Sequence, residues 1–233
     1  NLLKFYLKNS YLLVSYLMAF AIYKLYYKKK VRDELEIIID TFGLVDNVNK
    51  NGEFNENYLT GIYELFEKYN TNYAILLRPC QFAKNPFKLR HFFKIISQDK
   101  RDFIFEYELL KLSDFFTLLS LMLLYPFKTL RLLQKEVSKE DKIFNHSLLV
   151  DIKYFSFDSL TRYILGKHLS KIDSIEKIFS WSEFQVIERS FNYAIRKNSQ
   201  KIELKALQFY LNYEVYFNSY VDDLDDDMLS APH

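Results

Sequence analysis

Cysteine, glycine and proline are scarce in this chain of 233 residues, which holds one cysteine, four glycines and four prolines. The single cysteine, Cys80, excludes a disulfide within the chain and a zinc site built from cysteines. The glycine-rich G-x-G-x-x-G and P-loop sequences and the G-x-S-x-G sequence are all absent. The chain therefore lacks the common phosphate-binding loops and the nucleophile elbow of hydrolases.

An excess of charge of one sign is also lacking, because 32 Lys and Arg face 30 Asp and Glu, for a net charge of +2. This balance does not suggest a nucleic-acid-binding protein. The four histidines are scattered without metal-ligand spacing. The acidic run at residues 222–227 lacks the glycine and glutamate positions of an EF-hand. We therefore expect no metal, no bound cofactor and no nucleic-acid partner.

Apolar residues are plentiful instead, since hydrophobic residues make up 49% of the chain and aromatic residues 18%. Short runs rich in β-branched and apolar residues predict strands, and segments with apolar residues at helical spacing predict helices between them. This alternation predicts an α/β fold with a mostly parallel sheet flanked by helices. The expected strands are residues 35–40, 73–77, 103–105, 175–179, 202–204 and 214–217, and the expected helices include residues 58–69, 109–127, 148–169 and 182–197.

The first 31 residues form an apolar segment that we separate from the α/β domain at residues 32–233. A helix is expected over residues 11–27, but the uncharged run between Lys8 and Lys24 is shorter than the roughly 20 residues that span a bilayer. No small-residue cleavage site of a signal peptide follows it. The helix either lies at a cytoplasmic membrane surface or is buried by the rest of the protein. The helix at 109–127, which Pro126 is expected to end or kink, is more in keeping with a core helix.

The segment at residues 179–196 reads as a strand that runs directly into a helix, with polar groups at the junction. Ligands of open α/β sheets bind at the carboxyl ends of the strands, and a helix N-terminus attracts anions. Gln185, Arg189, Asn192 and Arg196 share one helical face, and Arg189 is suited to phosphate or carboxylate. The alternative interpretation is structural: Ser182 with Gln185, or Ser180 with Glu183, has the spacing of a capping box, and the arginines would form a solvated face.

Two further strand ends carry acidic residues. Asp40 lies at the tip of the strand at 35–40 and is a candidate polar contact, or a cap for the following turn. Glu106 and Glu108 follow the strand at 103–105, but their spacing does not establish a general acid and base.

The chain resembles bacterial surface-carbohydrate (capsule or lipopolysaccharide-type) biosynthesis proteins with a glycosyltransferase-B-like (GT-B-like) architecture. The match is carried by four pieces of sequence. They are Ile39-Asp40-Thr41-Phe42; Phe54 with Tyr58-Leu59-Thr60-Gly61; Trp181-x-Glu183-x-Gln185-Val186-Ile187-x-Arg189-Ser190-Phe191-Asn192; and residues 205–210 with Gln208. Phe184 stands where the family has Asn, Glu188 where it has Asp, and the glycines that flank the family's Gln are missing around Gln208.

The resemblance implies that this fragment is the amino-terminal Rossmann-like domain of a glycosyltransferase-like protein. Such a protein transfers a sugar from a nucleotide-sugar donor, held mainly by a carboxyl-terminal domain, to a glycan or lipid-linked acceptor. By analogy Glu183 is the catalytic carboxylate contact or base, Gln185 recognises a sugar hydroxyl and Arg189 contacts phosphate or an acidic sugar. Asp40 and Gln208 complete the substrate-binding set.

The same resemblance implies a cytoplasmic protein peripheral on the inner membrane. A second hypothesis is a non-catalytic, membrane-associated binding or scaffold protein of the same pathway. A third, an integral membrane protein, requires residues 11–27 or 115–127 to span the bilayer.

Overall fold

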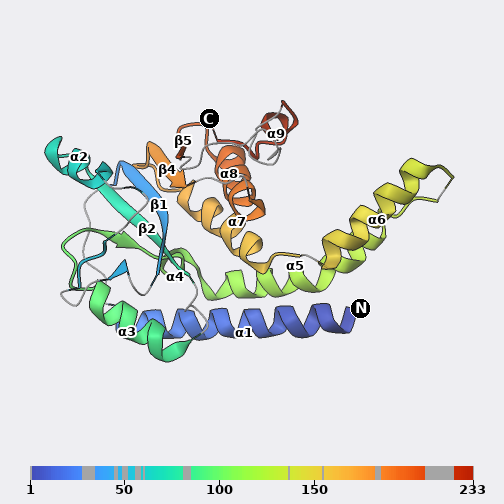
Figure 1. The fold of residues 1–233 in the computed structure, drawn as a ribbon, viewed down its shortest axis with the longest axis horizontal. Coiled ribbons are helices and arrows are strands. Elements are labelled where there is room, and N and C mark those ends of the chain that lie inside the picture. Colours follow the sequence, from blue (N-terminus) through green and yellow to red (C-terminus); the bar gives the residue numbers. More distant parts are fainter. Residues whose placement is uncertain are drawn as a thin grey trace.

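Five parallel strands form one sheet at the centre of the protein, in the order β3-β2-β1-β4-β5 (Figure 1). The computed structural model describes residues 2–27, 35–44, 47–48, 52–55, 59, 61–80, 85–135, 137–153, 155–181, 185–207 and 223–232. The strands are β1 (Ile37–Gly43), β2 (Tyr73–Pro79), β3 (Phe103–Ile104), β4 (Lys177–Trp181) and β5 (Glu203–Leu207). The predicted α/β class with a parallel sheet is confirmed.

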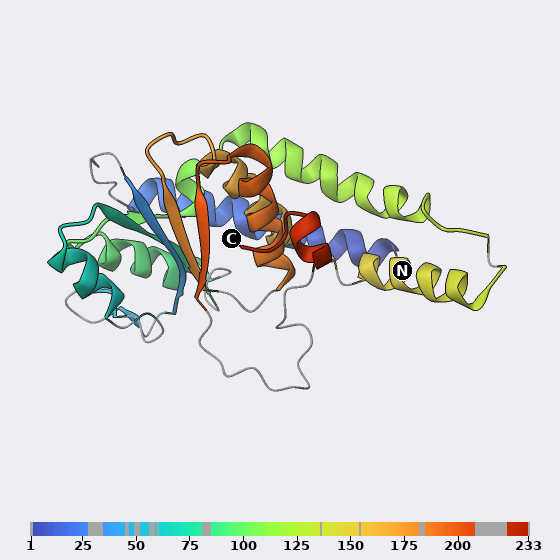
Figure 2. The ribbon, with the colours of Figure 1, turned by 90° about the horizontal axis from the view of Figure 1, so that it is seen from above.

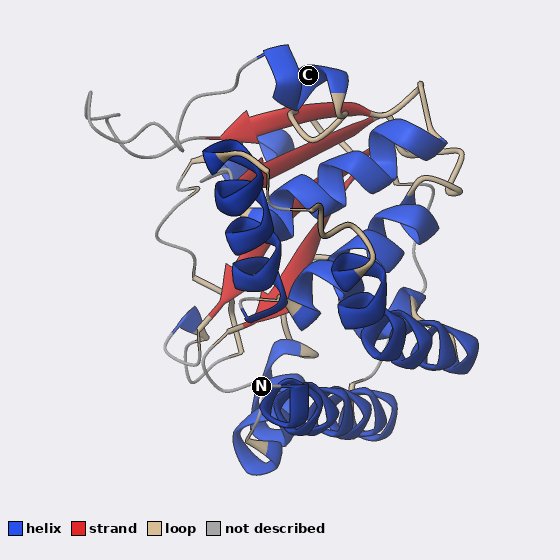
Figure 3. Ribbon diagram, turned by 90° about the vertical axis from the view of Figure 1, so that its right-hand side faces the viewer, coloured by secondary structure: helices blue, strands red, loops and turns tan. Residues whose placement is uncertain are grey.

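Helices cover both faces of this sheet (Figure 3). In the described part they are α1 (Leu2–Tyr26), α2 (Ile62–Lys68), α3 (Pro86–Ile96), α4 (Glu106–Leu109), α5 (Leu112–Leu130), α6 (Lys139–Lys153), α7 (Phe157–Leu169), α8 (Val186–Asn198) and α9 (Asp223–Asp227). Helix α3 starts where proline predicts it, because Asn85 caps the helix and Pro86 occupies its first turn.

Alternation along the strands divides the core into two layers. Ile39 and Ile75 pack with α1, α2 and α3 on one face. Their neighbours Ile38 and Ala74 pack with α7 and α8 on the other face. Successive side chains of a strand point to opposite faces, so a strand buried on both faces needs a continuous apolar run. The run Ile37–Ile39 meets this need.

Helix α1 is packed against the domain along one side. Ala19 and Tyr23 belong to the same buried cluster as the sheet, and the Phe20 ring lies 5.3 Å from that of Phe115 on α5. Helices α1, α5 and α6 extend beyond the sheet (Figures 1 and 2). By length and composition α1 is able to cross a membrane, although core helices of soluble proteins meet the same criterion.

Three local expectations differ from the structure, and a fourth falls on residues that it does not describe. The segment 148–169 is not one helix, because Ser156 starts α7 by accepting a hydrogen bond from the Ser159 amide at 3.2 Å. The expected connection at 135–142 is partly helical, since α6 begins at Lys139. Helix α5 continues past Pro126 to Leu130. The expected strand at 214–217 lies outside the described residues.

Helices α7 and α8 approach closely at Gly166. A Cβ atom on this residue would lie 2.8 Å from the Ala194 Cβ and 3.0 Å from the Phe191 carbonyl oxygen. Both distances are too short for carbon contacts, so any side chain here must separate the two helices.

We expect Gly166→Ala to lower the free energy of unfolding by about 1–3 kcal/mol, the usual cost of overpacking. Helix propensity alone has the opposite sign, since alanine is favoured over glycine by about 1 kcal/mol. Urea unfolding measures the difference, and Lys167→Ala, at an exposed position of the same helix, is the control with little effect. Stabilisation by Gly166→Ala would contradict the close packing.

Candidate functional site at the carboxyl edge of the sheet

The carboxyl ends of the strands bring polar residues together from distant parts of the sequence. Asp40 of β1 lies in register with Ser180 of β4, and Arg78 lies near the end of β2. Glu106 follows β3. Between β1 and β4 the strand order reverses direction, and such switch points are where open α/β sheets bind ligands.

Asp40 is held by a buried ion pair. The Arg162 guanidinium of α7 donates two hydrogen bonds to its carboxylate, one from Nη1 to Oδ1 at 3.0 Å and one from Nη2 to Oδ2. Ser180 Oγ donates a third to Oδ2 at 3.0 Å. The guanidinium also lies 4.0 Å from the centre of the Phe191 ring. Asp40 therefore joins β1, β4 and α7, and borders a narrow recess of about 20 Å³.

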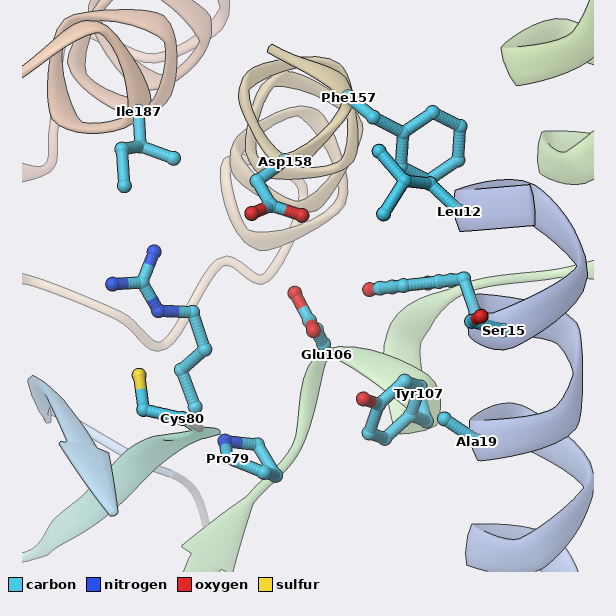
Figure 4. A pocket seen from close by; sticks show the side chains of 12 residues that line it. Leu12, Ser15, Ala19, Pro79, Cys80, Glu106, Tyr107, Phe157, Asp158 and Ile187 are labelled. Carbon is cyan, nitrogen blue, oxygen red and sulfur yellow. The ribbon is translucent and has the colours of Figure 1, made fainter. Parts of the chain in front are cut away.

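A larger cavity of about 310 Å³ lies beside this recess. Side chains from α1, α4, α7 and the first turn of α8 enclose it together with the end of β2. Its lining residues are Leu12, Ser15, Tyr16, Ala19, Arg78, Pro79, Cys80, Glu106, Tyr107, Phe157, Asp158 and Ile187. Figure 4 shows the carboxyl groups of Glu106 and Asp158 directed toward each other across the cavity. The cavity thus has a charged side and an apolar side.

Glu106 is the most perturbed acid of the cavity. Burial away from water raises the pKa of its carboxyl to about 7, and Asp158 adds to this effect. The Tyr16 hydroxyl, Arg162 and Arg78 act in the opposite direction. A carboxyl with a pKa near neutrality can gain or lose a proton at physiological pH, as general acid–base catalysis requires.

Arg78 lies at the carboxyl end of β2, and Cys80 directly follows the strand. Burial opposes the charge on Arg78, but Cys80, Asp40 and the acidic groups Glu106 and Asp158 outweigh it and raise the pKa of Arg78. Burial raises the pKa of the Cys80 thiol despite the lowering influence of Arg78. Cys80 is therefore a neutral thiol rather than an activated nucleophile.

The Tyr16 hydroxyl is an unusual feature of the cavity wall. Its oxygen is buried and has no hydrogen-bond partner among the described residues. It interacts with Glu106 closely enough to influence the pKa of both groups, and Thr161 also acts on the pKa of Tyr16. Buried polar atoms are rarely left without a partner, so this hydroxyl is available to a bound molecule.

The predicted site residues are only partly brought together. Asp40 lies at the carboxyl edge, while Glu183 and Gln208 lie outside the described residues. Gln185 is exposed and caps α8, and its backbone N–H donates to Glu188 Oε2 at 3.2 Å. Arg189 is half-buried on α8. Of the three that the structure describes, Asp40, Gln185 and Arg189, none lines the larger cavity.

A capping box starts α8, but it is neither of the predicted pairs, and Ser182 and Glu183 lie outside the described residues. The box is formed by Gln185 and Glu188, and α8 therefore begins at Val186 instead of residue 182. Ser180 is a strand residue whose hydroxyl is used by Asp40. The expected start of the helix at Ser182 is wrong, since the backbone of Gln185 is extended.

The expected polar face of α8 has a structural use at its carboxyl end. Asn192 is buried, and its Nδ2 donates to the Ser230 carbonyl at 3.1 Å. Arg196 donates to the Ala231 carbonyl at 3.1 Å and pairs with Asp226 at 2.9 Å. These two residues therefore attach the carboxyl-terminal segment to α8 instead of facing a ligand.

Sequence reasoning missed most of the cavity. Arg78 carried a usable signal, because it is a lone charge at the end of an apolar strand. Glu106 was considered only beside Glu108, whose carboxylate instead accepts a hydrogen bond from the Tyr23 hydroxyl at 3.3 Å. Tyr16 and Arg162 lie within helical patterns and carried no such signal.

Within the described ranges, no group of three or more His, Cys, Asp or Glu side chains is placed to hold a metal ion. Comparison with protein-family models, with curated proteins and with solved structures finds no match. The resemblance to surface-carbohydrate biosynthesis proteins therefore stays a prediction.

Glu106→Gln tests the burial of the acid. The carboxyl ionises at a pKa of about 7 in the folded protein and at about 4.3 in an unfolded chain. Between these values the folded state binds the proton more tightly, so this group's stabilising contribution is lost as the pH rises through 7. The stability of wild type relative to the variant should fall by about 3 kcal/mol between pH 4 and 8. Urea unfolding at a series of pH values measures it, and a constant difference would contradict the burial.

Proposed function

We propose that this protein is a glycosyltransferase-like protein of bacterial surface polysaccharide biosynthesis. It transfers a sugar from a nucleotide-sugar donor to a glycan or lipid-linked acceptor, with the Rossmann-like sheet forming the amino-terminal half of a GT-B-like architecture. The chemistry is assigned to the carboxyl edge of the sheet, where ligands of such sheets bind.

One observation carries the proposal. Two of the pieces that resemble the family, Ile39-Asp40-Thr41-Phe42 and the tryptophan piece, are more than 100 residues apart, yet the first lies on β1 and the second starts at the end of the adjacent strand β4. Asp40 of the first piece lies opposite Ser180 and is hydrogen-bonded to it, and the tryptophan piece starts at the next residue, Trp181. A shared location at the switch point is what a common substrate site requires.

The proposed roles of the residues in these pieces come from the resemblance. Glu183 is the catalytic carboxylate contact or base, Gln185 contacts a sugar hydroxyl and Arg189 contacts phosphate or an acidic sugar. Asp40 acts by positioning, because its carboxylate already accepts hydrogen bonds from Arg162 and Ser180. Gln208 is assigned to the substrate-binding set from the resemblance alone.

A second candidate is a non-catalytic binding or scaffold protein of the same pathway. It is favoured by the use of Gln185 as the cap of α8 and by the neutralisation of Asp40 in its ion pair. In this case Gln185 and Asp40 stabilise the fold of a glycosyltransferase-like domain and do not bind a substrate.

The proposal includes contact with an anionic membrane surface through α1. The side of α1 that faces away from the domain carries Leu3, Leu7, Tyr11 and Val14 as exposed residues, at the spacing of one helical stripe. Helix α1 contains no acidic residue, and its lysines, Lys4, Lys8 and Lys24, are all exposed. An apolar stripe with lysines beside it is typical of helices that lie in the plane of an anionic bilayer. Because the opposite side of α1 is packed in the core, an in-plane position preserves the fold and a spanning one does not.

Glu183→Gln and Arg189→Ala test the transferase. In cells that depend on the variant copy, both should abolish polysaccharide synthesis, because each removes a proposed substrate contact. Thermal unfolding should be unchanged, and Lys197→Ala on the exposed face of α8 is the matched control. Normal polysaccharide from both variants would reject the site, and wild-type protein that supports synthesis but turns over no nucleotide-sugar would favour the scaffold.

The doubly substituted Leu7→Glu/Val14→Glu protein tests membrane contact. Each leucine- or valine-sized side chain removed from the bilayer costs about 2 kcal/mol, so flotation with phosphatidylglycerol vesicles should be lost. Leu65→Glu, at an exposed position of α2, should float like wild type. Equal flotation of all three proteins, or equal binding to phosphatidylcholine vesicles, would contradict the proposed surface.

A further inference from the structure

We propose that the cavity between α1, α4 and α7 is the acceptor subsite, in which the carboxyl groups of Glu106 and Asp158 bind hydroxyl groups of a neutral sugar. This inference rests on the proposed function, in which this domain is the acceptor-side half, and names the place within the domain where the acceptor would bind. Of the residues of the tryptophan piece that the resemblance makes functional, the two that the structure describes, Gln185 and Arg189, do not line this cavity.

The size of the cavity fits a single sugar unit. Its volume of about 310 Å³ is at the lower end of small-molecule pockets, which range from about 300 to 1,000 Å³. The cavity also has the two kinds of surface that a sugar ring presents. Phe157 and Leu12 offer an apolar wall to the ring's C–H groups, and Glu106 and Asp158 face the polar side (Figure 4).

The charge balance favours hydroxyl groups over phosphate. Arg162 is paired with Asp40. Among the described lining residues, Arg78 is the cationic group, and Glu106 and Asp158 are the acidic ones. An ionised carboxylate only accepts hydrogen bonds, so it recognises O–H donors and repels a diphosphate. The nucleotide part of the donor therefore does not belong in this cavity.

The Tyr16 hydroxyl is a further polar group on the wall of the cavity, and it acts electrostatically together with Glu106 and Thr161. It is a buried polar group in the cavity wall with no hydrogen-bond partner in the described part of the chain. Its ring is fixed by neighbouring aromatics, with the centre 5.2 Å from that of Tyr107 and 6.1 Å from that of Phe157. A sugar hydroxyl beside Glu106 would supply the missing hydrogen bond.

Within the proposed transfer, Glu106 is the proton acceptor. The acceptor hydroxyl gives its proton to the ionised Glu106 carboxylate as its oxygen forms a bond to the anomeric carbon of the donor. The bond from that carbon to the diphosphate oxygen breaks, and the nucleoside diphosphate leaves with the electron pair. Glu183 is then a carboxylate contact and not the base.

Cys80 provides a direct test of occupancy, because it lines the cavity and is the only cysteine of the sequence. Galactose and N-acetylglucosamine are added separately to the purified protein, and alkylation of Cys80 by iodoacetamide is followed by mass spectrometry. Inorganic phosphate and uridine diphosphate are the anionic comparators. At least one sugar should slow alkylation, and Asp158→Asn should weaken that protection about tenfold, as expected for the loss of a charged hydrogen bond.

Glu108→Gln is the control, because Glu108 does not line the cavity. Should the thiol resist alkylation, saturation-transfer NMR of the same sugars with wild type and Asp158→Asn gives the same comparison. Protection by phosphate or uridine diphosphate alone, or no effect of either sugar by both methods, would overturn the inference.

Sugar transfer separates this inference from the proposed function. Glu106→Gln should lower the rate about 100-fold and remove the fall in rate that wild type shows as the pH drops below 7. Unchanged transfer by Glu106→Gln and Asp158→Asn would leave the proposed function in place and overturn the acceptor subsite. Sugar binding that depends on Asp158, in a protein without transferase activity, would overturn the proposed function and leave the cavity as a sugar-binding site.

Discussion

The buried ion pair between Asp40 and Arg162 determines the arrangement of the carboxyl edge. It joins the central strand β1 to α7 and, through Ser180, to β4. A buried ion pair contributes little net stability, yet removing one partner is strongly destabilising because the other charge is left buried and unpaired. The pair therefore acts chiefly as a positional constraint: it fixes α7 against the switch point and places Asp158, one turn earlier on the same helix, over the cavity.

Neutralisation of Asp40 also sets the electrostatics of the cavity. The remaining polar groups, Arg78, Glu106 and Asp158, interact with one another and with the pair, since Arg162 lowers the pKa of Glu106 and Asp40 raises that of Arg78. Removal from water is the largest influence on Glu106 and keeps its pKa near 7 in spite of two nearby arginines. Perturbed acids of this kind concentrate at functional sites, although structural ion-pair networks also produce them. The cavity, the unpartnered Tyr16 hydroxyl and the position at the sheet edge distinguish this case.

Helix α1 connects two parts of the proposal. Its inner side supplies Leu12, Ser15, Tyr16 and Ala19 to the cavity wall, and its outer side carries the apolar stripe. A movement of α1 at a membrane surface would therefore change the shape of the cavity. This coupling offers a physical route by which contact with a membrane affects the handling of an acceptor.

The sequence predicted the strands well, because apolar runs such as Ile37–Ile39 and Ala74–Leu77 have few other stable locations than a sheet buried on both faces. It also predicted that function belongs at the carboxyl edge and that Asp40 lies there. It did not predict the partner of Asp40, since Arg162 lies 122 residues away within an ordinary helical pattern. Tyr16 was equally hidden, because its role depends on how α1 packs. The spacing of residues in the sequence shows which side chains are neighbours on one helix or strand. The residues that line this cavity come from five helices and strands.

The pKa of the Glu106 carboxyl tests the account most directly. The carboxyl carbon of selectively ¹³C-labelled Glu106 can be followed by NMR across the pH range, with Glu106→Gln to assign the signal. The account predicts a midpoint at about pH 7 that shifts when Asp158 is replaced by Asn. A midpoint near the ordinary glutamate value of about 4.3, unaffected by that replacement, would contradict it.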